Sequence, residues 1–291
     1  MATGIIVIDK PADWTSHDVV AKLRGIFHEK RVGHAGTLDP MATGVLPVFV
    51  GRATRAVEFA AEAGKEYVAG LRLGVVTDTQ DVTGTILSHA PVSVTDGQMR
   101  DTIEKFKGEI QQIPPMYSAV KIKGKKLYEL ARKGREVERA PRAVTIYELE
   151  LLERVGQTDF MLRVACSKGT YIRTLCYDIG RMLGCGGTMY TLRRTRAAGF
   201  CLNQAMTLEQ VQQAADEGRA ESLLLPVDAY FARYPSLTVG EGEVRSIRNG
   251  AAFVWAGQDG TYRVYGPDGT FLMLGRLVCG EMITIKSFFT V

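Results

Sequence analysis

Residues 33–48 read GHAGTLDPMATGVLPV, and the interpretation of the chain starts from this stretch. Its glycines and Pro40 make residues 33–44 a poor helix or strand, whereas residues 45–50 have the apolar pattern of a strand. Asp39 precedes Pro40, whose ring restricts the backbone, so its carboxylate lies on a rigid loop and can act as a nucleophile or a base. The local pattern by itself favours a simpler role, an Asx-turn aspartate that caps the next element.

His34 lies on the same loop, where its ring could stack or form a hydrogen bond. A single histidine on a loop is more often structural. Ser/His/Asp hydrolase chemistry has little support, because the chain contains no G-x-S-x-G elbow.

The regions on both sides of this loop alternate between strand and helix patterns. Residues 4–8 predict a buried strand, and Thr15 or Ser16 can cap a helix that extends to Phe27. Further helices are expected at 53–63, 95–106, 126–133, 170–183 and 207–216. Further strands are expected at 67–73, 116–122, 144–152, 159–166, 189–196 and 198–202. The absence of a regular βαβ rhythm predicts an α+β fold with a mixed or mainly antiparallel sheet.

After about residue 234 the pattern changes to short β-rich segments separated by Gly-Asp and Pro-Asp-Gly turns, with one helix near 241–249. We expect a main domain over residues 1–234 and a small β domain over residues 235–291. No G-x-G-x-x-G follows the first strand and no G-x-x-x-x-G-K-[ST] occurs, which disfavours a nucleotide-binding fold.

The composition excludes several classes of protein. The chain has 291 residues, 46% hydrophobic and 23% charged, and can bury its own core. No apolar run approaches the ~20 residues of a membrane span, and the N-terminus has no signal-peptide pattern. The five cysteines form no C-x-x-C pair and the four histidines no H-E-x-x-H motif, so we expect free thiols, no bound metal and a cytoplasmic location.

The positive charge is concentrated in two stretches. Residues 121–142 contain nine basic and three acidic residues, and residues 168–196 contain six basic and one acidic. A local positive surface suits a polyanion, because phosphate contacts release counterions. A solvated charged face is the alternative, although the tyrosines interleaved in and beside these stretches favour RNA.

The run at 33–48 resembles the signature of the TruB family of tRNA pseudouridine synthases, with Asp39 inside it. Further stretches resemble family motifs in the same order along the chain: Lys10-Pro11 with Thr15-Ser16, Lys65-Glu66-Tyr67 with Leu73-Gly74 and Thr77-Asp78-Thr79, PPMYSAVK at 114–121 with GKKLYELAR at 124–132, CSKGTYIRT at 166–174, and LRRT at 192–195. One departure is Asp13, which stands where the family usually has glycine.

The resemblance implies a pseudouridine synthase catalytic domain, with a central mixed, mainly antiparallel sheet flanked by helices and a thumb insertion at 114–142. The C-terminal part is similar in size and texture to a PUA-like RNA-binding domain. The implied activity isomerises uridine 55 in the tRNA T-loop by breaking C1′–N1, turning the base and joining C5 to C1′. This reaction needs no cofactor or metal. We expect a monomer whose partner is the tRNA T-arm, with no membrane association.

The resemblance also assigns roles to single residues. Asp39 would be the catalytic carboxylate, ionised either to attack the ribose or base or to stabilise charge while a glycal forms, and the sequence leaves both routes open. Arg173 would pair with Asp39 and favour its charged form. Tyr67 would stack on the uracil, and Leu192 would line the other side of the pocket. Without the resemblance, Arg173 would be assigned a phosphate contact, and the tyrosine and leucine would be core residues.

A uridine stacked inside a folded T-loop must be flipped out to reach Asp39. His34 resembles the residue that occupies the space left by the base, Tyr171 a further pocket residue, and Lys10 an active-site support. The thumb would grip RNA through a set of basic residues: Lys121, Lys123, Lys125, Lys126 and Arg132.

Three other functions remain possible at this level. A non-catalytic tRNA-binding or tRNA-folding protein could use the same scaffold, but the presence of Asp39, Tyr67 and Arg173 argues against it. A synthase working within a guide-RNA ribonucleoprotein is disfavoured by the thumb insertion, the short C-terminal domain and the lack of basic tails. A glycosidase would require two carboxylates across the scissile bond, and no such pair is evident.

Overall fold

The computed structural model describes residues 2–122 and 124–289. Its helices are α1 (Ser16–Phe27), η1 (Gly51–Ala56), α2 (Val57–Ala61), α3 (Asp96–Glu104), α4 (Leu127–Ala131), α5 (Ile172–Met182), η2 (Leu202–Gln204), α6 (Leu208–Asp216), η3 (Ala220–Leu223), η4 (Val227–Phe231) and α7 (Glu241–Arg248), where η marks a 3₁₀ helix. Helix α1 begins where the sequence predicts, because Thr15 and Asp18 form a reciprocal capping box.

The main sheet is mixed and mainly antiparallel, as predicted. Its order is β1-β3-β12-β4-β11-β10-β7, with β2 added to β3 and β13 to β12. The strands are β1 (Gly4–Lys10), β2 (Val32–His34), β3 (Thr43–Val50), β4 (Lys65–Leu73), β7 (Gly108–Gln112), β10 (Arg142–Val155), β11 (Asp159–Cys166), β12 (Gly187–Ala197) and β13 (Phe200–Cys201). Only the pairing of β12 with β3 is parallel within this sheet of the described residues.

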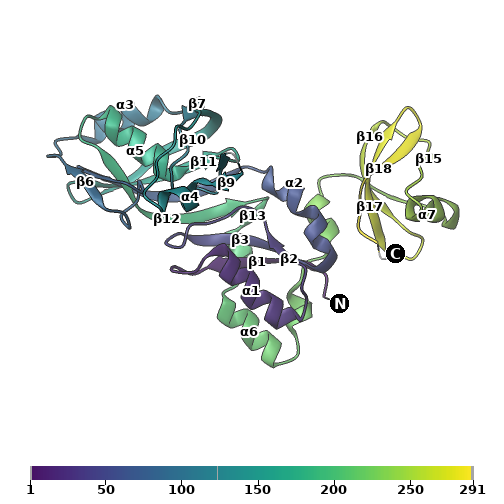
Figure 1. Cartoon of the computed structure of the whole chain (residues 1–291). Coiled ribbons are helices and arrows are strands. Elements are labelled where there is room, and N and C mark those ends of the chain that lie inside the picture. Colours follow the sequence, from purple (N-terminus) through teal and green to yellow (C-terminus); the bar gives the residue numbers. More distant parts are fainter. Residues whose placement is uncertain (1, 123, 290–291) are drawn as a thin grey trace.

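Helices cover the two halves of this sheet separately (Figure 1). Helices α1 and α6 lie side by side and pack on β1 and β3 in one apolar cluster. Helices α3 and α5 pack on β4, β10, β11 and β12 in a second cluster. The two halves meet where β12 pairs with β3, so a residue at this junction can contact side chains from both halves.

A second sheet forms the C-terminal β-rich domain, drawn in yellow beside the main domain in Figure 1. Its order is β14-β16-β17-β18-β15, from strands β14 (Ser236–Thr238), β15 (Phe253–Val254), β16 (Gly260–Tyr265), β17 (Phe271–Val278) and β18 (Glu281–Ser287). Phe231 of the main domain is fully buried against Phe271 and Phe288 of this domain. Aromatic packing therefore fixes the small domain against the large one.

The expected strand at 116–122 is wrong except for its last two residues. Among the described residues, strand β8 (Lys121–Ile122) pairs only with β9 (Lys125–Lys126), and residues 113–120 have no regular structure. Their carbonyl groups serve other partners: Ser118 O accepts from Tyr128 N and Val120 O from Leu127 N. The apolar residues of this segment led to the expectation of a strand. Its carbonyl groups instead accept hydrogen bonds from the first residues of α4.

Smaller differences concern 3₁₀ segments and polar strands. The helix expected at 53–63 divides into η1 and α2, and the strand expected at 198–202 shortens to β13 after a turn at Ala198–Gly199. The sequence did not predict β2, β7 or the hairpin of β5 (Val75–Thr77) and β6 (Ile86–His89). Strands β6 and β7 are mostly exposed and therefore lack a buried apolar pattern.

Candidate active site

The Asp39 loop connects β2 to β3 and is held to the fold on both sides of the aspartate. Ser16, the first residue of α1, accepts a hydrogen bond from Leu38 N at 2.9 Å and donates one to Leu38 O at 3.3 Å. Leu38 itself is buried in the main core. Where the loop ends, a Cβ at Gly44 would lie 2.2 Å from Arg194 O, so glycine is required for β3 to meet β12.

Lys10 supports this loop from the end of β1. Its fully buried ammonium group donates to the carbonyls of Pro11 at 2.7 Å, Trp14 at 2.6 Å and Pro40 at 3.1 Å. Burial lowers the pKa of Lys10 to about 8. Lys10 thus fixes the backbone directly after Asp39 and does not contact its carboxylate by hydrogen bond or ion pair within the described residues.

Arg173 pairs with Asp39 through two nitrogen atoms. Its Nε lies 3.0 Å from Asp39 Oδ2 and its Nη2 donates to Oδ1 at 3.4 Å. The arginine side chain is 6% exposed and the aspartate side chain 37%, so a buried cation holds a carboxylate that a ligand can still reach. The structure brings this expected pair together: Asp39 comes from the loop between β2 and β3, and Arg173 comes from α5.

The arginine is itself fixed by three other groups. Its Nη2 donates to Tyr117 O at 2.8 Å, its Nη1 donates to Thr79 O at 3.2 Å, and Nη1 lies 3.6 Å from Asp81 Oδ2. Asp81 is 5% exposed and accepts from the hydroxyls of Thr79 and Thr83. The guanidinium therefore has little freedom to leave the Asp39 carboxylate.

The electrostatic environment of Asp39 is a balance of opposing effects. Burial raises its pKa above the ordinary value, and the nearby Asp81 carboxylate acts in the same direction. Arg173 and, more weakly, Lys10 lower the pKa without offsetting burial. The arginine does favour the charged form, as expected, but the net shift is upward.

Tyr67 and Leu192 lie in the same apolar cluster as Leu38, each 6% exposed. They come from neighbouring strands, β4 and β12, in the register that pairs Tyr67 with Arg194. Burial raises the pKa of Tyr67, and the Arg194 guanidinium partly opposes this effect. The tyrosine hydroxyl is therefore held in its neutral form and can donate a hydrogen bond.

Arg194 is a buried cation that the sequence analysis did not assign to the site. It is 0% exposed, and it donates to Val45 O at 2.7 Å and to Gly36 O at 3.1 Å. It ties β12 to the Asp39 loop. Asp81 was missed as well; the nearby Thr77-Asp78-Thr79 motif pointed to this segment, but only the tertiary contact with Arg173 identifies the carboxylate.

His34 lies on β2 with its ring edge against His17 of α1, the ring centroids 5.6 Å apart. Its Nδ1 is buried and has no partner among the described residues. Burial, His17 and Arg194 lower the pKa of His34 to about 4, so the ring is neutral near pH 7. Tyr171 is the N-cap residue of α5 and lies two residues before Arg173.

The first basic stretch contains a short strand pair and a short helix. Strands β8 and β9 make a hairpin that continues into α4, and it carries Lys121, Lys125 and Arg132 as exposed residues. Lys126 and Arg132 lie over the ring of Tyr128, each 5.3 Å from its centroid. Lys123, also expected to bind RNA, lies outside the described residues.

The second basic stretch, residues 168–196, lies only partly on the surface, because two of its six cations are buried whereas Lys168, Arg181 and Arg196 are exposed. Arg173 and Arg194 are buried, Arg193 pairs with Asp9 at 2.7 Å, and Lys168 pairs with Glu62. The two buried arginines bond to backbone carbonyls of distant segments, and a count of charges along the sequence does not reveal this role.

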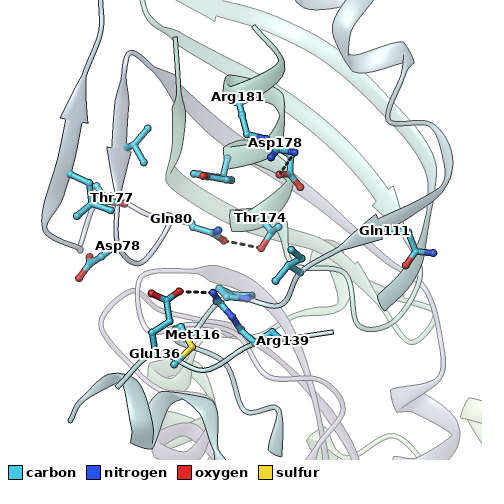
Figure 2. Close-up of a pocket in the computed structure, with 15 residues that line it drawn as sticks. Thr77, Asp78, Gln80, Gln111, Met116, Glu136, Arg139, Thr174, Asp178 and Arg181 are labelled. Carbon is cyan, nitrogen blue, oxygen red and sulfur yellow. Dashed lines mark hydrogen bonds and ion pairs between the residues drawn. The ribbon is translucent and has the colours of Figure 1, made fainter. Parts of the chain in front are cut away.

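A cavity of about 390 Å³ lies between the thumb and α5 (Figure 2). Met116 and Arg139 line its thumb side. Thr174 and Gln80, joined by a 2.8 Å hydrogen bond, line the opposite side. Asp39 does not line this cavity, so the cavity is separate from the candidate active site.

The chain matches two family models. Residues 24–172 match "TruB family pseudouridylate synthase (N terminal domain)", and residues 173–232 match "tRNA pseudouridylate synthase B C-terminal domain". The second match ends before β14, so it does not include the β-rich domain.

Curated relatives cover most of the chain. Proteins named tRNA pseudouridine synthase B are 47% identical in Alkaliphilus oremlandii (85% of this chain, 81% of the relative) and 47% in Streptococcus thermophilus (86% and 87%). The relative of the same name in Aromatoleum aromaticum is 45% identical (94% and 88%).

Solved structures agree with these matches. A chain from an H/ACA RNP bound to a substrate RNA containing 2′-deoxyuridine superposes with a TM-score of 0.74 at 26% identity, covering 99% of this chain and 85% of that one. A chain from a Cbf5-Nop10-Gar1 complex gives 0.74 at 28% identity with the same coverage. Fold and sequence together define an isomerase, a pseudouridine synthase. Within this class, the chain belongs to the TruB family.

Proposed function

We propose that this enzyme converts uridine 55 in the T-loop of tRNA to pseudouridine, with Asp39 as the catalytic carboxylate. The observation that carries the proposal is the pair between buried Arg173 and partly exposed Asp39, 3.0 Å apart. Family membership and relatives named tRNA pseudouridine synthase B support tRNA as the substrate.

The reaction is an isomerisation. The C1′–N1 bond of uridine breaks, the uracil turns within the site, and a C5–C1′ bond forms. C5 loses its proton and N1 gains one, so the atoms balance without oxidant, hydrolysis or co-reactant. Asp39 can act in its ionised form either as a nucleophile or as the base that leads to a glycal. Arg173 keeps that form available.

The remaining residues would bind and orient the nucleotide. The target uridine is flipped out of the T-loop, Tyr67 stacks on it, and Leu192 lines the other side of the pocket. His34, neutral near pH 7, takes the place of the flipped base in the loop. Tyr171 completes the pocket beside Arg173.

We also propose how the chain contacts tRNA. The thumb at 114–142 grips phosphates through its basic residues, and residues 235–291 form a separate PUA-like domain after a catalytic domain of residues 1–234. Proteins recognise folded RNA mainly by shape, splayed bases and phosphates, and an exposed basic hairpin suits the last of these. The enzyme would act as a cytoplasmic monomer.

A non-catalytic tRNA-folding protein on the same scaffold is the alternative. A buried guanidinium directed at a partly exposed carboxylate argues against it, because RNA binding alone does not need this arrangement. A carboxylate beside the bound RNA would instead repel phosphates.

The test is direct. An unmodified tRNA transcript is incubated with the protein without added cofactor, and pseudouridine is mapped along the RNA. We expect modification at position 55 and none in a transcript with cytidine there. Asp39→Asn should abolish turnover with excess enzyme while tRNA binding persists. Clear residual turnover would remove Asp39 from its role, and binding without any modification by the wild type would favour the alternative.

A further inference from the structure

Gln112 has an unusual position at the edge of the main sheet. It is the last residue of β7 and is 1% exposed. Its side-chain amide bonds to the backbone of Tyr171 in both directions: Tyr171 N donates to Oε1 at 3.0 Å, and Nε2 donates to Tyr171 O at 3.2 Å. Glutamine supplies both a donor and an acceptor at this reach, whereas glutamate lacks the donor.

The bonded backbone controls the start of α5. Tyr171 is the N-cap residue of this helix, and its side chain makes no capping hydrogen bond. Its carbonyl accepts from Gln112 and also from Leu175 N at 3.0 Å. Arg173 follows within the first turn, so a shift of that turn moves the guanidinium relative to Asp39.

The same short segment contacts the first turn of α5 a second time, through Arg173. Five residues after Gln112, Tyr117 O accepts from Arg173 Nη2 at 2.8 Å. The segment entering the thumb is therefore bonded to the first turn of α5 at both ends, once through Gln112 and once through Arg173 itself.

We propose that Gln112 is a positioning residue for the reaction: it fixes the first turn of α5 so that Arg173 faces Asp39, and it fixes the entrance to the thumb against the same turn. This inference rests on the proposed catalytic role of Asp39. It assigns no contact with the substrate to Gln112.

Loosening Arg173 has a defined electrostatic consequence. The charged groups that act on Asp39 are Arg173 from α5, Asp81 from the segment after β5, and Lys10 from β1. Of these, Arg173 is the strongest influence that lowers the pKa of Asp39. A displaced guanidinium therefore raises this pKa, and the fraction of ionised carboxylate at mildly acidic pH falls.

The experiment compares Gln112→Ala and Gln112→Glu with the neighbouring exposed control Gln111→Ala. Single-turnover rates with excess enzyme are measured from pH 5 to pH 8 on an unmodified tRNA transcript, with filter binding and thermal unfolding alongside. We expect both Gln112 variants to lose about 10- to 100-fold in rate, as small misplacements do. Their acidic limb should move to higher pH, with tRNA affinity within about threefold and the control unchanged.

Gln112→Glu keeps the side-chain length and the acceptor for Tyr171 N, so it tests positioning even if the alanine variant unfolds. Wild-type rates in the glutamate variant, or a rate loss without any displacement of the acidic limb, would overturn the inference. Asp39→Asn separates the two proposals. If that variant stays active, the proposed function fails; if it is inactive while the Gln112 variants behave as wild type, only the positioning role fails.

Discussion

Arg173 Nε lies 3.0 Å from Asp39 Oδ2, although 134 positions separate the two residues in the chain. The pair joins the two halves of the main sheet, since Asp39 precedes β3 and Arg173 belongs to the helix packed on β12. The ionisation of Asp39 therefore depends on how the two halves of the sheet meet, because that junction sets the distance to Arg173.

The first prediction concerns this cation. Arg173→Ala should lower the saturated single-turnover rate by about 100-fold or more, because a preorganised charge is lost. Without the guanidinium the pKa of Asp39 rises, so the ionised fraction at a given acidic pH falls and the acidic limb moves upward. Arg173→Lys keeps the charge but not the two-nitrogen geometry. Its rate should lie between those of the wild type and Arg173→Ala. An unchanged acidic limb in a folded alanine variant would contradict this assignment.

The second prediction concerns Asp13, which has a φ of 64°. This left-handed conformation favours glycine, the residue that the family usually has there. Asp13→Gly should raise the free energy of unfolding by about 0.5–1 kcal/mol, measured by urea denaturation. Asp13→Asn is the matched control for the lost charge and should change stability little. A glycine variant less stable than wild type would show that the aspartate side chain contributes more than its backbone strain costs.

The third prediction distinguishes residues that bind tRNA from residues that act in the catalytic step. Replacing Lys121, Lys125 and Lys126 with alanine should weaken tRNA binding and reduce the slope of log K against log salt by about 2–3 for three lost phosphate contacts. The rate at saturating tRNA should change little. A control triple, Lys22, Lys30 and Lys105 to alanine, removes the same charge elsewhere on the surface. Normal tRNA binding by the thumb variant at every salt concentration would show that these lysines make no phosphate contacts and lie on a solvated surface.

The fourth prediction uses His34, whose folded pKa is about 4. An unfolded histidine titrates near pH 6.5, so between these values the unfolded chain binds a proton that the folded protein excludes. Acidification from about pH 6.5 towards 4 therefore lowers stability. His34→Gln should lose less stability than wild type between pH 7 and pH 5 in urea unfolding. Identical pH dependence in both proteins would contradict this prediction, because it would show that His34 binds a proton as readily in the folded protein as in the unfolded chain.

The fifth prediction follows from a carboxylate mechanism, which uses no Lewis acid. Activity on a short T-arm hairpin that folds without magnesium should survive EDTA. Residues 2–122 and 124–289 contain no group of three or more His, Cys, Asp or Glu side chains that could hold a metal ion. Loss of activity in EDTA that zinc or magnesium restores would reveal a missed site.

The sequence by itself determined the elements whose signals are local. Strand β11 alternates between buried and partly exposed residues along its length, and α1 begins at a capping box, so both were predictable from spacing alone. The motif around Asp39 and the arginine in CSKGTYIRT pointed to the candidate pair through their resemblance to TruB family motifs.

Only the tertiary structure decided which charges are buried and what they hold. Arg173 and Arg194 lie in a stretch that reads as a basic surface, yet their nitrogens bond to backbone carbonyls and carboxylates from distant segments. Gln112 and Tyr171 are 59 positions apart, and nothing local in either residue predicts their paired hydrogen bonds. The physical reason is that the energy of a buried polar group depends on the partners that folding brings to it, and neighbours in the chain do not specify those partners.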